Sequence, residues 1–430
     1  MKNIVASVGL VALGASVIQM AHAQTQSADT SKPWSVSATL RGFYDDNFNA
    51  LPDTYFTGLN NPNGYAKSAL GFEISPSAAV AWNLENTKFS LDYTFSFKQY
   101  DEDFYNSTDN SAKSHTFTAL LEHSFSERLR ASVRDSFVVG QEPDLLRAGN
   151  TFSTFQRVTG DNMLNYGNVL VNADITRQFG IEVGYDNVWY NYADDGTGSL
   201  SATLDRIEQT PHIDARYKFT QQTTGLLGYQ FGLTDYTADE LLSPTSSLMS
   251  DVRNSRANYI YAGADHNFSP EMSGKLRAGA RFTDFYNDSN AGNNTSPYVK
   301  ASLRYLYAPE SFVEGGFSYD FTASDVLGMN AAGTSVSTGA DAATIYASMT
   351  HRITPKLFVN LLGQIQWSTY VDGIYDGETD RFYLAGLNLE YRFTKNFLAN
   401  VGYNYDNLTS DIPNRSYDRN RVYIGVTASY

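Results

Sequence analysis

Apolar and polar side chains alternate with a period of two in eighteen short stretches, and this pattern restricts the fold more than any other feature of the chain. Successive side chains of a β-strand point to opposite faces, so each stretch would have one apolar and one polar face. Tight turns and long polar loops alternate between the stretches, which is typical of transmembrane barrels whose apolar faces meet lipid. The clearest stretch alternates Phe89, Leu91, Tyr93, Phe95 and Phe97 with Ser90, Asp92, Thr94, Ser96 and Lys98.

We therefore predict an all-β fold: a single antiparallel up-and-down transmembrane β-barrel over residues 34–430, with about 18 strands and 16 as the alternative. A β-helix or propeller of similar repeat length is less favoured, because a propeller blade needs four strands per repeat and these repeats hold two. Pro76 and Pro211 fall inside two of the stretches, so we expect either bulges or different boundaries there. The predicted strands are 34–44, 67–82, 88–100, 114–125, 129–140, 164–176, 179–192, 206–219, 223–236, 256–268, 273–286, 296–307, 311–323, 342–353, 357–370, 380–393, 397–407 and 419–430.

The predicted tight turns share a short pattern in which a bulky residue ends one strand, Ser or Thr opens the turn, and a bulky residue usually starts the next strand. Examples are Phe125-Ser126, Phe219-Thr220, Phe268-Ser269, Ile353-Thr354 and Phe393-Thr394. Bulky residues at one depth would form an aromatic girdle at a membrane interface. Stacking of aromatic rings on sugars along a pore is the alternative use for the 30 Tyr and 26 Phe.

The N-terminus resembles a secretory signal, with Lys2 followed by an apolar run and the small-x-small site Ala21-His22-Ala23. We expect residues 1–23 to be a cleaved signal peptide and residues 24–33 a short periplasmic segment. No later stretch offers the roughly 18 consecutive apolar residues of a membrane-spanning helix. These features together predict the outer membrane of a Gram-negative cell.

The formal net charge is −15, and the acidic residues gather in the predicted outer loops, which argues against a nucleic-acid partner. The expected partners are outer-membrane lipids and lipopolysaccharide and the barrel-assembly machinery, with a homo-oligomer as a further option. Divalent cations that bridge the loops to lipopolysaccharide are an alternative to simple solvation of the loop carboxylates. The outward residues at the end of the last strand, Val426, Ala428 and Tyr430, resemble a barrel-assembly signal. The match is incomplete, because Ala428 stands where an aromatic residue is commoner.

Catalysis and metal binding have little support in the sequence. Outer-membrane lipases use a His and a Ser two residues apart on one strand face, and none of the six histidines has a Ser at that spacing. No two histidines have the spacing of metal ligands, and the chain has no cysteine. We expect no enzyme activity, no metal and no cofactor.

Charged residues at inward positions form two sets on the predicted barrel wall. The basic set is Lys275, Arg277, Arg281, Lys300 and Arg304, and the acidic set is Asp174, Glu182, Asp186 and Asp214. We expect both sets to line the pore, where opposed charges can order water and select solutes. Local neutralisation is the simpler interpretation, since Glu314 and Asp320 lie on the strand next to the basic set, and the two interpretations are compatible.

The third outer loop, residues 141–163, is the longest, and in general porins the third loop folds inward as a constriction. Its candidate constriction residues are Arg147, Phe152, Phe155 and Arg157. The predicted strand places Leu361 on the lipid-facing side and Gln364 on the inner side. We therefore expect Leu361→Arg to block membrane assembly and Gln364→Arg to be tolerated.

Two short segments, Gly42-Phe43-Tyr44-Asp45-Asp46-Asn47 and Asp135-Ser136-Phe137, are similar to a β-barrel porin family often found beside exopolysaccharide export loci. The resemblance implies a porin-like barrel without catalytic residues. The expected function is a channel for passive diffusion of small hydrophilic solutes. The alternative is an exopolysaccharide-associated or structural surface barrel that acts with periplasmic partners.

Overall fold

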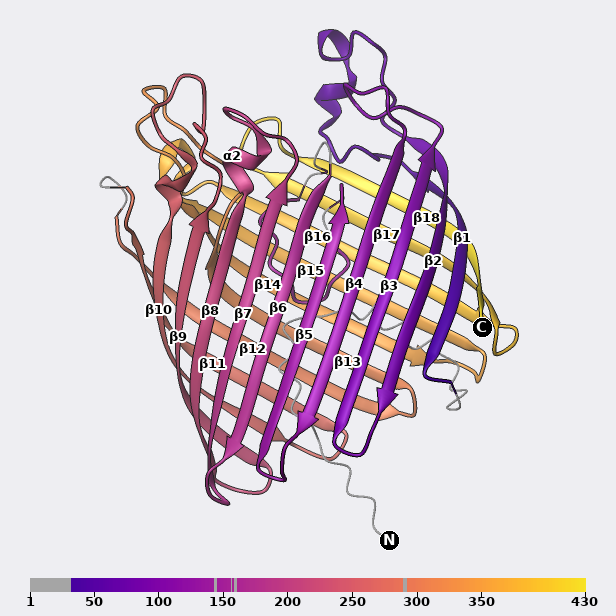
Figure 1. The fold of residues 1–430 in the computed structure, drawn as a ribbon. Helices are drawn as coiled ribbons and strands as arrows, with labels where there is room; N and C mark the ends of the chain where they lie inside the picture. Colours follow the sequence, from indigo (N-terminus) through magenta and orange to yellow (C-terminus); the bar gives the residue numbers. More distant parts are fainter. Residues whose placement is uncertain (1–31, 143–144, 156, 158–160, 289–291) are drawn as a thin grey trace.

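The computed structural model describes residues 32–142, 145–155, 157, 161–288 and 292–430, which form one closed barrel of antiparallel strands (Figure 1). All the predicted strands are present, and each observed boundary lies within three residues of the predicted one. The predicted signal peptide lies outside the described residues. The strands are β1 (Trp34–Asp45), β2 (Ala69–Asn83), β3 (Thr87–Tyr100), β4 (Ser111–Ser124), β5 (Leu129–Gly140), β6 (Asn162–Asp174), β7 (Phe179–Tyr192), β8 (Arg206–Lys218), β9 (Thr223–Tyr236), β10 (Ser255–Asn267), β11 (Met272–Phe285), β12 (Asn294–Ala308), β13 (Ser311–Thr322), β14 (Gly339–Arg352), β15 (Leu357–Val371), β16 (Thr379–Arg392), β17 (Phe397–Ser410) and β18 (Tyr417–Ser429).

The barrel closes because its first strand pairs on both sides. Leu40 in β1 lies opposite Ile74 in β2 and opposite Val426 in β18, and β2 to β17 each pair with their two neighbours in sequence. The 18-stranded sheet therefore has no free edge, which satisfies the backbone hydrogen bonds that a membrane cannot satisfy.

Exposure alternates along the strands as the sequence pattern predicts. In β15, Leu361 is 39% exposed on the outer face, while Gln364 and Gln366 are 2% and 0% exposed on the inner face. In β18, Ile424 is 64% exposed and Thr427 is 4% exposed. The predicted assignment of apolar faces to the outside is confirmed for these strands.

Neither of the two prolines noted in the sequence causes a bulge. Pro76 lies opposite Ala38 and Pro211 lies opposite Tyr185, and both strands keep the same register on either side of the proline. Both expectations, a bulge or a misplaced boundary, were wrong. Each proline has no N–H to donate, and two residue pairs are missing from the pairing with the following strand at that point. Beyond these two pairs the register is the same as before.

The turns at one end of the barrel are tight because their Ser or Thr hydroxyl accepts backbone N–H groups. The Thr220 hydroxyl oxygen accepts from the N–H groups of Gln222 and Thr223 at 3.1 and 2.9 Å. Ser126 makes the equivalent bonds at 3.2 and 3.1 Å. The aromatic residues that precede these hydroxyls, such as Phe219 at 66% exposure, lie outside the barrel. This arrangement suits an interface girdle.

The opposite end carries the long connections and the short helices, which stand above the barrel in Figure 1. None of the helices among the described residues is both long and apolar enough to cross a membrane. Buried apolar clusters also gather at this end and inside the barrel, where loops pack on the wall. The helices are η1 (Asp53–Phe56), η2 (Gly58–Asn60), α2 (Leu200–Leu204), η3 (Ser250–Arg253) and η4 (Gly373–Tyr375).

Candidate functional site

The acidic set lies on the inner wall, where two of its members form ion pairs with β8. The Glu182 carboxylate, 3% exposed, pairs with the Arg216 guanidinium. Asp174, near the short turns, accepts hydrogen bonds from Lys218 Nζ with both oxygens at 3.0 Å. These two carboxylates are therefore neutralised by two β8 cations, Arg216 and Lys218, that belong to neither predicted set.

The other two acidic residues bind neutral donors. Asp186 accepts from Asn168 Nδ2 at 2.7 Å, and Asp214 accepts from the Tyr261 hydroxyl at 2.6 Å. Tyr261 is in β10 and Asp214 is in β8, so this bond crosses β9 at Gly228. A Cβ atom at Gly228 would lie only 2.2–2.3 Å from both side chains, so glycine is required for the contact.

Two members of the basic set, one in β11 and one in β12, pair with carboxylates of β13. Arg281 Nη1 lies 3.3 Å from Asp320 Oδ1 and also donates to the Phe321 carbonyl oxygen. Arg304 Nη1 lies 3.4 Å from Glu314 Oε2. The structure thus shows the local pairing that was the simpler interpretation of these charges.

Arg277 connects the basic set to the acidic set. It donates to Asp265 at 2.8 Å, and Asp265 also pairs with Arg216 at 3.0 Å, which in turn binds Glu182. The chain of contacts runs from β7 to β11 along one side of the barrel. One member of each predicted set, Arg277 and Glu182, therefore lies at an end of this charge network.

The two lysines of the basic set also lie on the inner wall. Lys275 faces Asp265 in the register of β10 and β11. Lys300 Nζ lies 5.3 Å from the centroid of the Tyr298 ring, and its neighbours across the strands are Arg277 and Ser318. Within the described part of the chain, no carboxylate lies within ion-pair distance of Lys300.

The loop between β5 and β6 crosses the barrel and binds the opposite wall. Strands β6 and β15 are separated by nine steps in either direction around the ring. Gln364 accepts from the Gly149 N–H at 3.0 Å and donates to the Asn150 carbonyl at 2.7 Å. Gln366 accepts from the Phe152 N–H and donates to the Phe152 carbonyl, both at 2.8 Å. The two side-chain amides hold the loop as a neighbouring strand would hold it.

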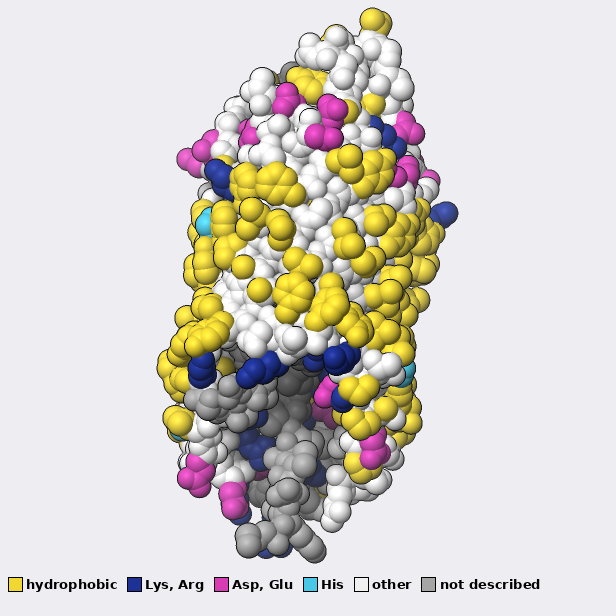
Figure 2. Space-filling model, turned by 90° about the vertical axis from the view of Figure 1, so that its right-hand side faces the viewer, with side chains coloured by type: hydrophobic (Ala, Val, Ile, Leu, Met, Phe, Trp, Pro, Cys, Tyr) yellow, Lys and Arg dark blue, Asp and Glu magenta, His cyan; other side chains and the backbone are white. Residues whose placement is uncertain are grey.

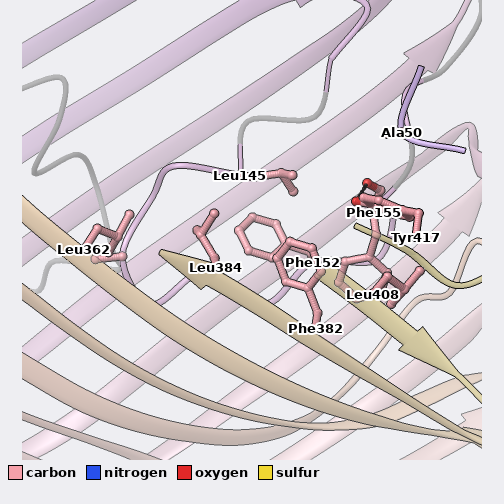
Figure 3. Packing of buried hydrophobic residues seen from close by; sticks show 10 residues of the cluster. Ala50, Leu145, Phe152, Phe155, Leu362, Phe382, Leu384, Leu408 and Tyr417 are labelled. Atoms are coloured by element: carbon pink, nitrogen blue, oxygen red, sulfur yellow. Dashed lines mark hydrogen bonds between the residues drawn. The ribbon is translucent and has the colours of Figure 1, made fainter. Parts of the chain in front are cut away.

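Aromatic side chains of the same loop complete the attachment (Figure 3). The Phe155 ring stacks on Phe382 at a centroid distance of 4.7 Å, and Phe152 meets Phe382 edge-on at 5.8 Å. The Tyr417 hydroxyl donates to the Phe155 carbonyl at 2.5 Å. The buried cluster formed by loop and wall is Ala50, Leu145, Ala148, Phe152, Phe155, Leu362, Phe382, Leu384, Leu408 and Tyr417.

The start of this loop is held by a cluster of ion pairs. Glu142 lies 2.9 Å from Lys98, 3.2 Å from Arg157 and 2.9 Å from Arg419. Burial alone would raise the pKa of the Glu142 carboxyl, but the surrounding cations hold this pKa well below its ordinary value. Glu142 therefore remains a carboxylate over the physiological pH range.

The other predicted loop arginine is also attached to the wall. Arg147 is 7% exposed, and its guanidinium carbon lies 5.4 Å from the centroid of the Tyr166 ring. It also donates to the Ser136 hydroxyl oxygen at 3.4 Å. All four predicted constriction residues thus lie inside the barrel in contact with its wall or with the base of the loop.

A second loop, residues 323–338, lies against the first and was missed by the sequence analysis. The Asp325 N–H donates to the Ser153 carbonyl at 3.1 Å. Arg415 joins this loop to the wall, at 2.7 Å from Asp325 and 2.9 Å from Asp380. Nothing in the alternation of side chains indicates that a loop packs on another loop, so no sequence signal separates these residues from solvated loop residues.

Two buried arginines connect further loops to this pair. Arg206, 1% exposed, donates to the Ser153 hydroxyl oxygen at 3.1 Å and to the Leu204 carbonyl at 3.0 Å. Arg253, also 1% exposed, donates to the carbonyl oxygens of Thr203 and Ser324. The long-loop end of the barrel is therefore covered by loops that hydrogen-bond to one another.

The residues of the predicted barrel-assembly signal lie on the outside of the barrel. Val426, Ala428 and Tyr430 point outward from the end of β18, and Tyr430 lies beside Trp34 at a ring distance of 5.9 Å. Asp135, from the segment with the family resemblance, also points outward and accepts from Asn165 Nδ2 at 3.0 Å. These positions are separate from the inner wall.

The arrangement provides a polar, charged inner wall and an internal loop that narrows the space within it. At the end with the short turns the barrel is hollowed, and Lys and Arg side chains lie around the hollow (Figure 2). Barrels of 16–18 strands are wide enough to hold an aqueous channel. The geometry thus suits passage of polar solutes past a fixed constriction.

Several solved structures resemble this chain. One is the outer membrane protein OpdK from Pseudomonas aeruginosa, at 13% identity and a TM-score of 0.42, covering 92% of this chain and 99% of that chain. OccAB3 from Acinetobacter baumannii has 11% identity and a TM-score of 0.40, with 92% and 99% covered. A mutant of the ferric enterobactin receptor PfeA from Pseudomonas aeruginosa has 10% identity and a TM-score of 0.42, with 92% and 80% covered. No curated protein matches the chain. The chain belongs to the putative beta-barrel porin 2 family, whose model matches residues 37–430.

Proposed function

We propose that this protein is a channel of the Gram-negative outer membrane through which small hydrophilic solutes diffuse passively. The observation that carries the proposal is the loop between β5 and β6, whose residues Gly149, Asn150 and Phe152 are held on the opposite wall by Gln364 and Gln366. A loop fixed across a barrel restricts the size of what passes. No catalytic group takes part.

The inner wall supports this function through its charges. Glu182, Asp265, Arg216 and Arg277 form a continuous network on one side, so the wall orders water along a defined strip. The network is locally neutral, which leaves Lys300 as a lumen cation with no carboxylate in ion-pair distance among the described residues. We assign to Lys300 the role of biasing the channel toward anionic solutes.

Planar-bilayer recording tests the channel directly. Purified, folded protein is expected to insert in discrete conductance steps whose size scales with salt concentration. Folded protein that never conducts, in any membrane composition, would overturn the proposal and favour the alternative of a surface or exopolysaccharide-associated barrel that needs periplasmic partners.

Reversal potentials in a salt gradient test the role of Lys300. Lys300→Glu should move the reversal potential toward cation selectivity, while conductance steps persist. The matched control is Lys356→Glu, which makes the same charge change on an exposed short turn. Equal shifts from both variants would refute a specific role for Lys300 without refuting conduction.

A further inference from the structure

The outer wall of the barrel carries polar side chains over β5 to β8, which we call the outer polar patch. It consists of Asp135, Asn165, Asn187 and Gln209. Asp135 and Asn187 both lie opposite Gly167 in β6, and Asn187 lies opposite Gln209 in β8. The patch is therefore a continuous strip across four neighbouring strands.

The patch lies within the apolar belt of the barrel. Along each strand, the outward residues on either side of a patch residue are the second neighbours in sequence. These neighbours are almost all apolar or aromatic: Val133 and Phe137 for Asp135, Tyr185 and Trp189 for Asn187, Ile207 and Pro211 for Gln209, and Met163 and Gly167 for Asn165. The patch is thus surrounded by side chains that suit lipid.

Several hydrogen-bonding groups of the patch have no partner within the described residues. Asn165 Nδ2 donates to Asp135 at 3.0 Å, and the Tyr185 hydroxyl donates to Gln209 Oε1 at 3.2 Å. Among the described residues, the Asn187 side-chain amide makes no hydrogen bond, and the Gln209 amide nitrogen donates none. Lipid tails cannot satisfy these groups, so a polar strip that faced only lipid would weaken the barrel.

The opposite side of the barrel shows what a lipid-facing wall looks like in this protein. The outward row of β15 contains Leu361, Ile365 and Trp367, each at least partly exposed and none with a charged or amide side chain. This part of the wall therefore lacks the carboxylate and amide side chains of the patch.

We propose that the outer polar patch is the contact surface between two copies of this chain in the membrane. A partner in the hydrocarbon layer must present polar groups at the same depth, and a second copy inserted in the same orientation does so. The patch contains both acceptors, on Asp135, and donors, on Asn187 and Gln209, so it is complementary to itself. Gly167 has no side chain between them, which allows two walls to approach closely.

Site-directed cross-linking tests the contact. The chain contains no cysteine, so a single introduced cysteine reports its own surroundings. In lipid vesicles, Asn187→Cys should form disulfide-linked dimers under mild oxidation, whereas Ile365→Cys on the opposite wall should remain monomeric. Equal cross-linking at both positions, or none at Asn187→Cys, would overturn the proposal.

The mass of the protein in mild detergent gives a second test. Wild-type protein should sediment as an oligomer, and Asp135→Leu should weaken association at least tenfold while keeping the heat-dependent gel mobility of a folded barrel. Asn187→Leu is the second variant, should Asp135→Leu fail to fold. Unchanged mass in the folded variants, or a monomeric wild type at every concentration, would show that the patch faces lipid. This outcome is independent of whether the barrel conducts ions.

Discussion

Replacing Gln364 by arginine tests whether the internal loop is held as the contacts indicate. The alternation of side chains alone predicts that Gln364→Arg is tolerated, because residue 364 lies on the polar inner face of β15. The structure leads to a different expectation, since Gln364 is 2% exposed and bonds to the loop at Gly149 and Asn150. The barrel should still fold, but the loop should leave the wall at Gly149 and Asn150.

The size of the effect follows from the two hydrogen bonds. Arginine has no acceptor, so the Gly149 N–H loses its partner at a cost of about 1–3 kcal/mol. The bond to the Asn150 carbonyl contributes about 1 kcal/mol, and the larger side chain must be fitted into a filled site. A total of about 2–4 kcal/mol would lower the docking equilibrium by roughly 30- to 1,000-fold at about 1.4 kcal/mol per factor of ten. Gln366 would still hold Phe152.

Trypsin accessibility in lipid vesicles measures the docking. Arg147 is 7% exposed in the docked loop, so wild-type protein should resist cleavage there and Gln364→Arg should be cut much faster. The conductance step of the variant should also be larger. Ile365→Leu, on the adjacent outward position, is the control and should behave as wild type. Cleavage and conductance equal to wild type in Gln364→Arg would refute this account of the loop.

Other changes test facing, electrostatics and assembly. Leu361→Arg places a charge against lipid at a cost of about 2–4 kcal/mol, so the heat-modifiable folded band should be lost or reduced on gels. The folded-state pKa of Glu142 is depressed, so its stabilisation is present above the ordinary value of about 4.3 and is lost as pH falls through the folded-state pKa. Trypsin protection of the loop should therefore be unchanged between about pH 8 and pH 5 and fall only in stronger acid; loss of protection near pH 6 would contradict the pairing with Lys98 and Arg419. Deleting Tyr430 should slow assembly in cells but leave refolding into detergent unchanged, as measured by the folded fraction in each.

The strands and their facing were predictable because both depend on a local pattern. A period of two is visible within ten residues, and a turn opened by Ser or Thr, such as Ser126 or Thr220, fixes where one strand ends and the next begins. Pro76 did not disturb the register, because a proline removes one N–H without adding a residue to the strand.

The contacts inside the barrel were not predictable in the same way. Arg216 and Asp265 join the two charged sets, but their meeting depends on the closeness of strands that are not adjacent. The bond between Asp214 and Tyr261 likewise crosses a strand that contributes only Gly228 at that level. Such contacts depend on the curvature of the closed wall, and the sequence of a single strand does not encode this curvature.

The places where alternation fails are nevertheless visible in the sequence, and they have a physical meaning. An inward apolar residue in a water-filled barrel would be exposed to solvent unless something covered it, and Leu362, Phe382 and Leu408 are inward and buried because the internal loop covers them. The same logic applies on the outer face: an outward carboxylate such as Asp135 would be exposed to lipid unless another polar surface covered it. The inward apolar residues mark where the internal loop binds. By the same reasoning, outward polar residues such as Asp135 mark where a second chain binds.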